Sequence, residues 1–123
     1  MKHAWMLAFL TAMCFAQDKT VDKKFWTVTA FSAASTAADA DTTANFGPRC
    51  TYEETNPGLY GEFPTAKRVT IVMGGLFVAS VGASYVLKRY YVHIWKVPLW
   101  PTPEMYLAYG HAVGAAHNAR SCY

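Results

Sequence analysis

The chain has 123 residues, of which 53% are hydrophobic and 15% are charged. This length allows one domain, and this composition excludes an intrinsically disordered segment. The 11 Lys and Arg residues outnumber the 8 Asp and Glu residues, which gives a formal net charge of +3. Because the basic residues lie at the ends of apolar segments and form neither a run nor a one-sided patch, we expect no nucleic-acid partner.

The N-terminal segment has the composition of a secretory signal peptide. Lys2 and His3 precede an uncharged apolar run over residues 4–16, which ends in small residues. A helix over this run would be about 20 Å long, short of a hydrocarbon layer of about 30 Å. We therefore predict a signal peptide over residues 1–16 and a helical membrane domain over residues 17–123, with an uncleaved membrane anchor as the alternative.

Hydroxyl side chains and one acid define a polar stripe on the first helix predicted in the mature chain, over residues 25–46. At helical pitch these residues share one face: Ser32, Ser35, Thr36, Asp39 and Thr43. An ionised Asp deep in a bilayer costs roughly 2.5–3.5 kcal/mol, so we expect the stripe to face other helices, with Asp39 hydrogen-bonded or neutral. Asp41 lies about 200° round the helix from Asp39, so the two carboxylates do not form a side-by-side pair.

The segment 47–66 is a joint rich in turn-forming residues. Pro57 has a fixed φ and Gly58 tolerates a positive φ, so the sequence predicts a β-turn that begins at Asn56. Glu54 directly precedes this turn, where the chain could fold back over the helix ends. A solvated loop is the alternative interpretation of this glutamate.

The most apolar segment spans residues 69–87 and contains no charged side chain. Two basic residues directly precede it and two directly follow it. Its apolar residues occupy every side, whereas a helix at the edge of a small soluble core would carry a polar face. We therefore predict a transmembrane helix over residues 66–89.

Aromatic residues follow this helix and are interleaved with basic side chains: Tyr90, Tyr91, His93, Trp95, Lys96 and Trp100. This composition is typical of a belt at the level of the lipid headgroups. Stacking on single-stranded nucleic acid is the alternative, but these residues have no further basic patch beside them.

The third predicted helix spans residues 103–119. Its uncharged part is shorter than a membrane span, so it either crosses with the help of its neighbours or lies re-entrant among them. His111 shares a face with Glu104 and Asn118 at steps of seven residues. His117 lies on another face, so we do not expect the two histidines to hold one metal ion together.

Small residues recur at a spacing of four on two of the predicted helices. The pairs are Gly75 and Ala79, Ser80 and Ser84, and Gly110 and Gly114. Such a spacing lets the backbone of another helix approach closely, so we predict that these residues pack against helices of the same chain or of a partner.

Several short motifs follow one another in a particular order along the chain: Phe25-Trp26, Asp39, Asp41-Thr42-Thr43, Cys50, Glu54, Asn56-Pro57, Gly61, Pro64, Arg68, His111 and His117-Asn118. This order resembles a family of small, uncharacterised bacterial integral membrane proteins. Its members have a signal peptide, about three membrane helices, a D-x-x-T element in the first helix and an E-x-N-P element in the following loop. The resemblance implies an all-α transmembrane bundle and a candidate polar site, but no reaction. The site residues are Asp39, Asp41, Glu54, Asn56, His111 and His117.

Three interpretations of the function are compatible with these features. The first is a structural or interaction module that packs against a partner through its small-residue helix faces. The second is an intramembrane metal-binding or proton-relay site built from Asp39, Glu54 and either His111 or His117. The third is a periplasmic soluble binding domain, which requires residues 69–87 to be a buried core helix.

The sequence leaves the reaction, the cofactor and the membrane orientation open. It contains no H-E-x-x-H, no C-x-x-C and no nucleophile elbow, so we predict neither an enzyme class nor a metal. We expect a multi-pass protein of the bacterial inner membrane, in contact with lipid and with a second copy or another membrane protein. Cys50 and Cys122 would emerge on one side of three crossings and could pair if that side is oxidising.

Overall fold

The computed structural model describes residues 19–44, 57–61 and 65–122. The predicted signal peptide lies outside the described residues, as do Glu54, Asn56 and the pairing of Cys50 with Cys122. The described elements are α2 (Lys23–Ala44), α3 (Pro57–Tyr60), α4 (Ala66–Arg89), β1 (His93–Ile94), β2 (Val97–Pro98) and α5 (Thr102–Cys122).

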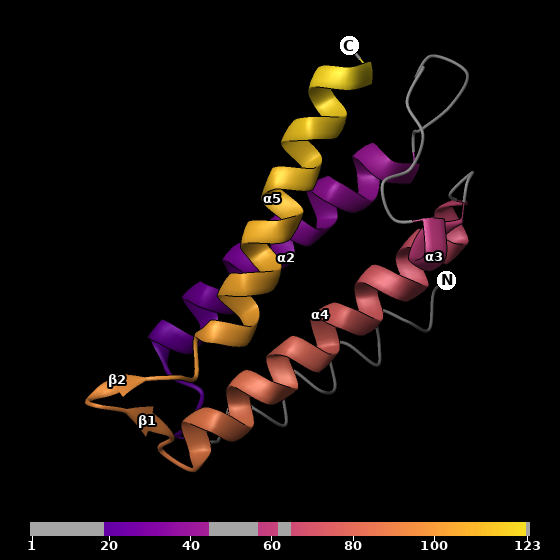
Figure 1. The fold of residues 1–123 in the computed structure, drawn as a ribbon. Coiled ribbons are helices and arrows are strands. Elements are labelled where there is room, and N and C mark those ends of the chain that lie inside the picture. The colour runs from indigo at the N-terminus through magenta and orange to yellow at the C-terminus, as the bar shows by residue number, and fades with distance from the viewer. Residues whose placement is uncertain (1–18, 45–56, 62–64, 123) are drawn as a thin grey trace.

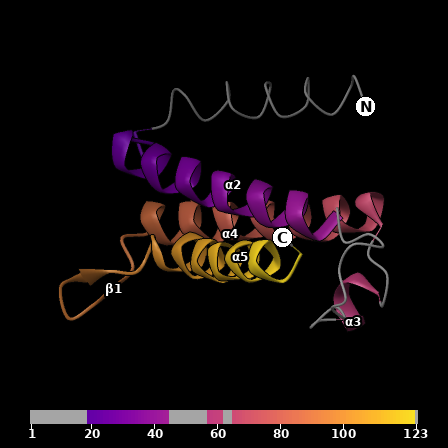
Figure 2. The same cartoon turned by 90° about the horizontal axis from the view of Figure 1, so that it is seen from above.

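Three long helices pack into a small bundle (Figure 1). α2 packs most extensively against α5 and also contacts α4, and α4 contacts α5. Seen from above, α2 runs along one side of the other two helices (Figure 2). The prediction of about three packed helices is therefore confirmed. The predicted range 66–89 matches α4, whereas α2 begins two residues before its predicted start and α5 continues beyond residue 119.

Side-chain caps set the first residues of two helices. The Asp22 carboxylate accepts a hydrogen bond from the backbone N–H of Phe25 at 2.9 Å, which satisfies a donor at the start of α2. The Thr65 hydroxyl accepts from the backbone N–H of Arg68 at 3.3 Å and caps α4 in the same way. Each cap leaves one fewer unpaired N–H at a helix end.

The joint between α2 and α4 differs from its prediction. Residues 57–60 form the short helix α3 in place of a β-turn, because a proline at the first helical position is as compatible with a helical turn as with a β-turn. The glycine with a positive φ, 86°, is Gly61 and not Gly58. Arg68 holds α3 against α4, since its Nε donates to the carbonyl oxygen of Leu59 at 2.9 Å.

A two-stranded hairpin, which the sequence analysis did not predict, connects α4 to α5. β1 and β2 are antiparallel, with Ile94 opposite Val97. Trp95 and Lys96 form the connection, with φ values of 58° and 103°. Positive φ at both positions is typical of a type I′ turn, and it costs of order 1–3 kcal/mol per residue for side chains other than glycine. The loop exposes 93% of Trp95.

The interior of the bundle is mainly polar. Among the described residues the buried apolar ones are few: Phe25, Tyr60, Val69, Met73 and Ala108. The buried polar residues in the same part of the chain are twice as many: Thr29, Ser32, Ser35, Thr36, Asp39, Thr43, Ser80, Ser84, Glu104 and His111. The predicted polar stripe of α2 therefore faces the other helices along its whole length, which confirms that expectation.

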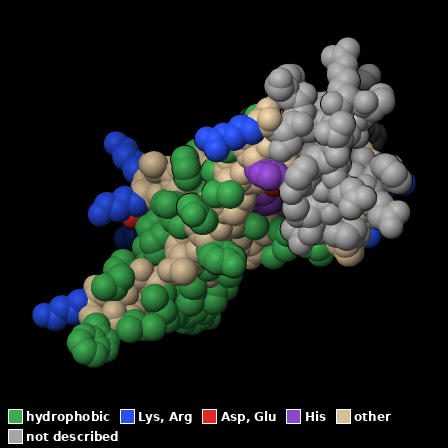
Figure 3. All heavy atoms as spheres, turned by 45° about the horizontal axis from the view of Figure 1, so that its top comes forward, with side chains coloured by type: hydrophobic (Ala, Val, Ile, Leu, Met, Phe, Trp, Pro, Cys, Tyr) green, Lys and Arg blue, Asp and Glu red, His purple; other side chains and the backbone are tan. Residues whose placement is uncertain are grey.

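The outer surface of the bundle is correspondingly apolar. Hydrophobic side chains cover much of the face shown in Figure 3. On α4, Ile71 is 64% exposed and Val78 is 68% exposed, and only 22% of the most apolar window of this helix is buried. By length and composition α4 can cross a membrane. Among the described helices it alone meets that criterion, because hydroxyl and ionisable side chains lower the hydropathy of α2 and α5.

The small residues that were predicted to pack against other helices fall into a buried group and an exposed group. Ser80 and Ser84 are buried, so this face of α4 packs within the bundle. Gly75 is exposed, and a Cβ built on it would meet no atom within 4 Å; Ala79 is also exposed. The same holds for Gly110 on α5, so these residues do not pack within the described part of the chain, and their packing against a partner stays a prediction.

Candidate buried polar site

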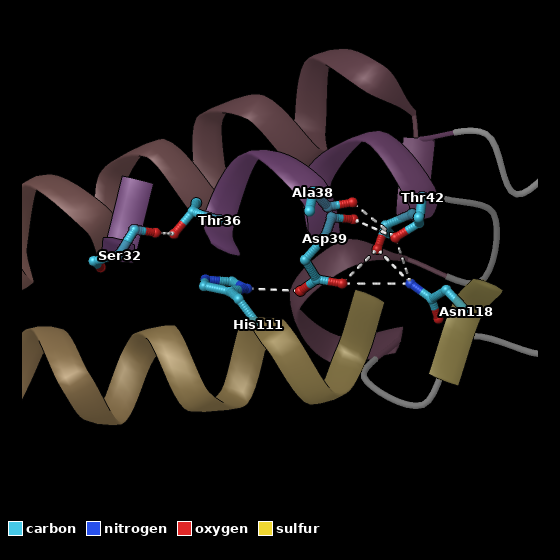
Figure 4. Close-up of polar contacts among 8 residues, drawn as sticks. Ser32, Thr36, Ala38, Asp39, Thr42, His111 and Asn118 are labelled. Carbon is cyan, nitrogen blue, oxygen red and sulfur yellow. Dashed lines mark hydrogen bonds and ion pairs between the residues drawn. The ribbon is translucent and has the colours of Figure 1, made fainter. Parts of the chain in front are cut away.

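The polar interior is organised around Asp39, which α2 places at its contact with α5. His111 of α5 points toward it, and the His111 Nδ1 and Asp39 Oδ2 atoms are 2.6 Å apart (Figure 4). Both residues are buried, with 8% of Asp39 and 5% of His111 exposed. Two of the candidate site residues, Asp39 and His111, are therefore in contact.

The second carboxylate oxygen of Asp39 is also in hydrogen-bonding contact. The Thr43 hydroxyl and the Asn118 amide nitrogen both donate to Asp39 Oδ1, each at 3.4 Å. Asn118 Nδ2 donates more closely to the hydroxyls of Thr43, at 3.0 Å, and of Thr42, at 3.3 Å. We call these five residues, Asp39, Thr42, Thr43, His111 and Asn118, the Asp39 centre.

Gly114 makes room for the Asp39 centre. A Cβ built on this glycine would lie 2.8 Å from Asp39 Oδ1 and 3.1 Å from the carboxyl carbon. No side chain fits at that separation without moving the carboxylate, so α5 reaches Asp39 only because a glycine stands at this position. Of the two small residues predicted on this helix, Gly114 therefore packs against α2 and Gly110 does not.

The Asp39–His111 contact sets the roles of the two imidazole nitrogens. When Nδ1 carries the proton it donates to the carboxylate, and this hydrogen bond fixes the orientation of the ring. His111 Nε2 is buried and has no hydrogen-bond partner among the described residues. The imidazole is therefore held through one nitrogen, while the other is unpaired among those residues.

Hydroxyl side chains of α2 that precede Asp39 in the chain differ from those of the Asp39 centre, because they form hydrogen bonds only within their own helix. The Thr36 hydroxyl donates to the carbonyl oxygen of Ser32 at 2.8 Å, and the Ser35 hydroxyl donates to that of Phe31 at 3.0 Å. These bonds stay within α2 and make no link to its neighbours. The Ser32 hydroxyl itself is buried without a partner in the described part of the chain.

A second buried carboxylate lies where all three long helices meet. Glu104 of α5 is 0% exposed, and neither of its carboxylate oxygens has a hydrogen-bond partner within residues 19–44, 57–61 and 65–122. The hydroxyls of Thr29 on α2 and Ser84 on α4 lie close enough to this carboxyl to interact with it, but neither hydroxyl makes a hydrogen bond of normal length and angle within the described residues. We call Glu104, Thr29 and Ser84 the Glu104 centre.

Sequence reasoning missed Glu104 as a site residue. An acid in the first turn of a helix is usually a solvated side chain that interacts with the helix dipole. Its position in the sequence could have identified Glu104. It lies seven residues before His111, which puts both side chains on the face of α5 that packs against α2. The structure buries them both.

The other predicted site residues do not join these centres. Asp41 and His117 are exposed on α2 and α5, away from the buried face. Glu54 and Asn56 lie outside the described residues. Among the residues that the structure describes, no group of three or more His, Cys, Asp and Glu side chains could hold a metal ion.

One end of the bundle is closed by an ion pair and two rings. Lys88 of α4 binds the Asp22 carboxylate, and its Nζ lies 4.6 Å from the centroid of the Trp100 ring. The rings of Trp100 and Phe25 stack with their centroids 5.8 Å apart. The hydrogen bond with Lys88, followed by that from the backbone N–H of Phe25, lowers the pKa of Asp22 below its usual value of 3.8. We call these four residues the Lys88 cluster.

Comparison of the chain with protein-family models, with curated proteins and with solved structures found no match. The resemblance to a family of small bacterial membrane proteins therefore stays a prediction.

Proposed function

We propose that this protein is a multi-pass protein of the bacterial inner membrane whose buried Asp39 centre relays protons. The membrane location is supported by the apolar outer surface, by the length and composition of α4 and by the polar interior. In water this distribution would be unfavourable, because large apolar areas would be exposed while polar groups were desolvated. In a bilayer the same distribution places apolar side chains in lipid and polar ones against one another.

The relatively polar helices α2 and α5 fit this arrangement as inner partners of α4. Polar residues within a membrane generally face the interior of a bundle and pair with one another. Asp39 of α2 and His111 of α5 pair in this way, so each helix lowers the cost of placing the other in the bilayer. The exposed aromatic side chains of Tyr90, Tyr91 and Trp95 suit a position at the lipid headgroups.

The observation that carries the relay is the contact of His111 Nδ1 with Asp39 while Nε2 has no partner among the described residues. Proton uptake at Nε2 produces an imidazolium beside the carboxylate, and loss of that proton restores the neutral ring. The pair therefore holds and releases one proton without breaking its own contact. A relay is favoured over a metal site because Asp39 and His111 supply only two ligand groups, and no group of three or more His, Cys, Asp and Glu side chains in the described part of the chain could hold a metal ion.

Reconstituted liposomes test the relay. The purified protein is inserted into vesicles that contain a pH-sensitive dye, and proton entry is followed after a pH step with the membrane potential clamped. We expect wild-type protein to raise proton flux at least about tenfold over protein-free vesicles. His111→Gln and Asp39→Asn should reduce the flux to that of empty vesicles.

The matched control is Asp41→Asn, which removes an exposed carboxylate two residues from Asp39 and should leave the flux unchanged. Each variant is first checked for helix content and a monodisperse elution profile in detergent. Wild-type flux equal to that of protein-free vesicles would overturn the proposal, and so would full flux in the His111→Gln variant.

A second candidate function, an interaction module, is supported by the outer face of α4. Gly75 and Ala79 are exposed there, four residues apart, beside the exposed side chains of Ile71 and Val78. Small residues at this spacing allow a second helix to approach closely in lipid. Gly75→Leu should abolish crosslinking to a second copy or partner, and Gly110→Leu is the control at a glycine of α5. Equal crosslinking in both variants would remove this candidate.

A further inference from the structure

The Glu104 centre is unusual because its buried oxygen atoms are unpaired. Both carboxylate oxygens of Glu104 and the hydroxyl oxygens of Thr29 and Ser84 lack hydrogen-bond partners in the described part of the chain. Glu104 and Ser84 are both 0% exposed. Because buried polar groups in folded proteins are almost always paired, such a cluster calls for a ligand that satisfies several oxygens at once.

The charge of the Glu104 centre limits which ligands can bind there. The centre carries one carboxylate and otherwise neutral hydroxyls. The nearest basic residue along α4 is Lys88, one turn beyond Ser84, and it already binds Asp22 at the end of the bundle. A single positive charge would therefore balance Glu104, whereas a divalent ion would leave an excess positive charge buried in the bundle.

The oxygen atoms of the Glu104 centre further limit the kind of ligand that can bind there. Carboxylate and hydroxyl oxygens are hard ligands, which suit hard cations and not soft metals that prefer thiolate or imidazole. The oxygens come from all three long helices, with Thr29 on α2, Ser84 on α4 and Glu104 on α5. A cation held among them would link the three helices by contacts that none of the side chains makes alone.

We propose that the Glu104 centre is a binding site for a monovalent hard cation, with Na⁺ as the ion it fits. Glu104 supplies the charge, and the hydroxyls of Thr29 and Ser84 supply neutral oxygen ligands. The Lys88 cluster closes the end of the bundle nearest this site. This site does not depend on proton transfer at Asp39.

Thermal unfolding in detergent tests the site with the ions themselves. Melting temperatures are measured in NaCl, KCl and choline chloride at equal ionic strength, over a range of Na⁺ concentrations. We expect Na⁺ to raise the melting temperature saturably, by about 5 °C or more over choline. Glu104→Gln should abolish the rise, and Ser84→Ala should move it to higher Na⁺ concentration.

Two control variants test whether the Na⁺ response depends specifically on the Glu104 centre. Ser80→Ala removes a buried serine on the same helix whose hydroxyl already donates to the carbonyl oxygen of Phe77 at 2.8 Å, so the Na⁺ response should remain. His111→Gln should also keep the response, which separates failure of this site from failure of the relay. If Glu104→Gln does not fold, the line width of ²³Na in NMR spectra of wild-type and Ser84→Ala protein replaces it, with weaker broadening expected for Ser84→Ala at the same Na⁺ concentration.

Three results would overturn the proposal. One is an equal melting temperature in NaCl and choline chloride, which would mean that Glu104 is buried as a neutral acid. Another is a Na⁺ response that persists in Glu104→Gln. The third is equal ²³Na broadening by wild-type and Ser84→Ala protein.

Discussion

Two buried carboxylates in the same bundle have opposite surroundings. Asp39 contacts His111, Thr43 and Asn118, which come from its own helix and from α5. Glu104 has no such partner among the described residues, although hydroxyls lie beside it. A buried charge is tolerated when it is paired, and both carboxylate oxygens of Asp39 have partners in the folded chain. The Glu104 centre, in contrast, is open to a ligand.

The difference shows that burial alone does not define the role of an ionisable side chain. Both acids are more than nine-tenths buried, yet one is part of a formed hydrogen-bond network and the other is not. Substitutions at the two centres should therefore change the free energy of unfolding in different directions and by different amounts, and the following experiments compare these changes.

Removal of the Asp39 side chain should have the largest effect. Asp39→Ala leaves His111 buried without its partner and opens a cavity, so we expect a loss of about 3–5 kcal/mol in the free energy of unfolding. Chemical denaturation in detergent, followed by circular dichroism, measures the change. The control Asp41→Ala alters an exposed acid of the same helix and should stay within about 0.5 kcal/mol of wild type. A loss below that limit for Asp39→Ala would show that the pair is not structural.

A methyl group at Gly114 should have the next largest effect. Gly114→Ala places a Cβ against the Asp39 carboxylate, and overpacking of this kind costs about 1–3 kcal/mol. Gly110→Ala is the matched control on the same helix, where the new methyl group meets no atom within 4 Å. It should raise the stability slightly, since alanine favours helix more than glycine. The same denaturation curves measure both variants, and a stabilising Gly114→Ala would contradict the observed close approach of α5 to α2.

An apolar substitution at Glu104 should act in the opposite direction to Asp39→Ala. In buffer without Na⁺, Glu104→Leu replaces an unpaired buried acid by a side chain of similar size, and we expect no loss or a gain of about 1–2 kcal/mol. Thermal unfolding in choline chloride measures this change. A loss comparable to that of Asp39→Ala would indicate that Glu104 is already paired within the chain.

The smallest effect concerns the exposed ion pair in the Lys88 cluster. Because the folded-state pKa of Asp22 lies below its usual value of 3.8, this residue adds stability at higher pH and loses it as the pH falls through the folded pKa. The Asp22 side chain is 49% exposed, so we expect only about 1–3 °C of acid destabilisation from this group. Melting curves of wild-type and Asp22→Asn protein between pH 5 and pH 3 should converge as the pH falls. Curves that stay parallel would contradict the contribution of Asp22.

Much of the helical architecture could be predicted because local patterns decide it. The uncharged run that becomes α4 has basic residues at both ends, and the polar stripe of α2 repeats at helical spacing. The hairpin between α4 and α5 could not be predicted, because Trp95 and Lys96 adopt positive φ values that their side chains disfavour. The candidate site was predictable in part. Asp39 and His111 were both identified, whereas Asp41 and His117 share their residue types but face outward.

Periodicity and hydropathy along the chain were enough to identify an apolar helix of membrane length and a polar face on the helix before it, because both properties depend on residues close together in sequence. The sequence did not determine which carboxylate has a hydrogen-bond partner, because this depends on contacts between different helices. Asp39 and His111, for example, are more than 70 residues apart in the chain. Only the packing of α5 against α2, with Gly114 at the point of closest approach, pairs one acid and leaves the other without a partner among the described residues.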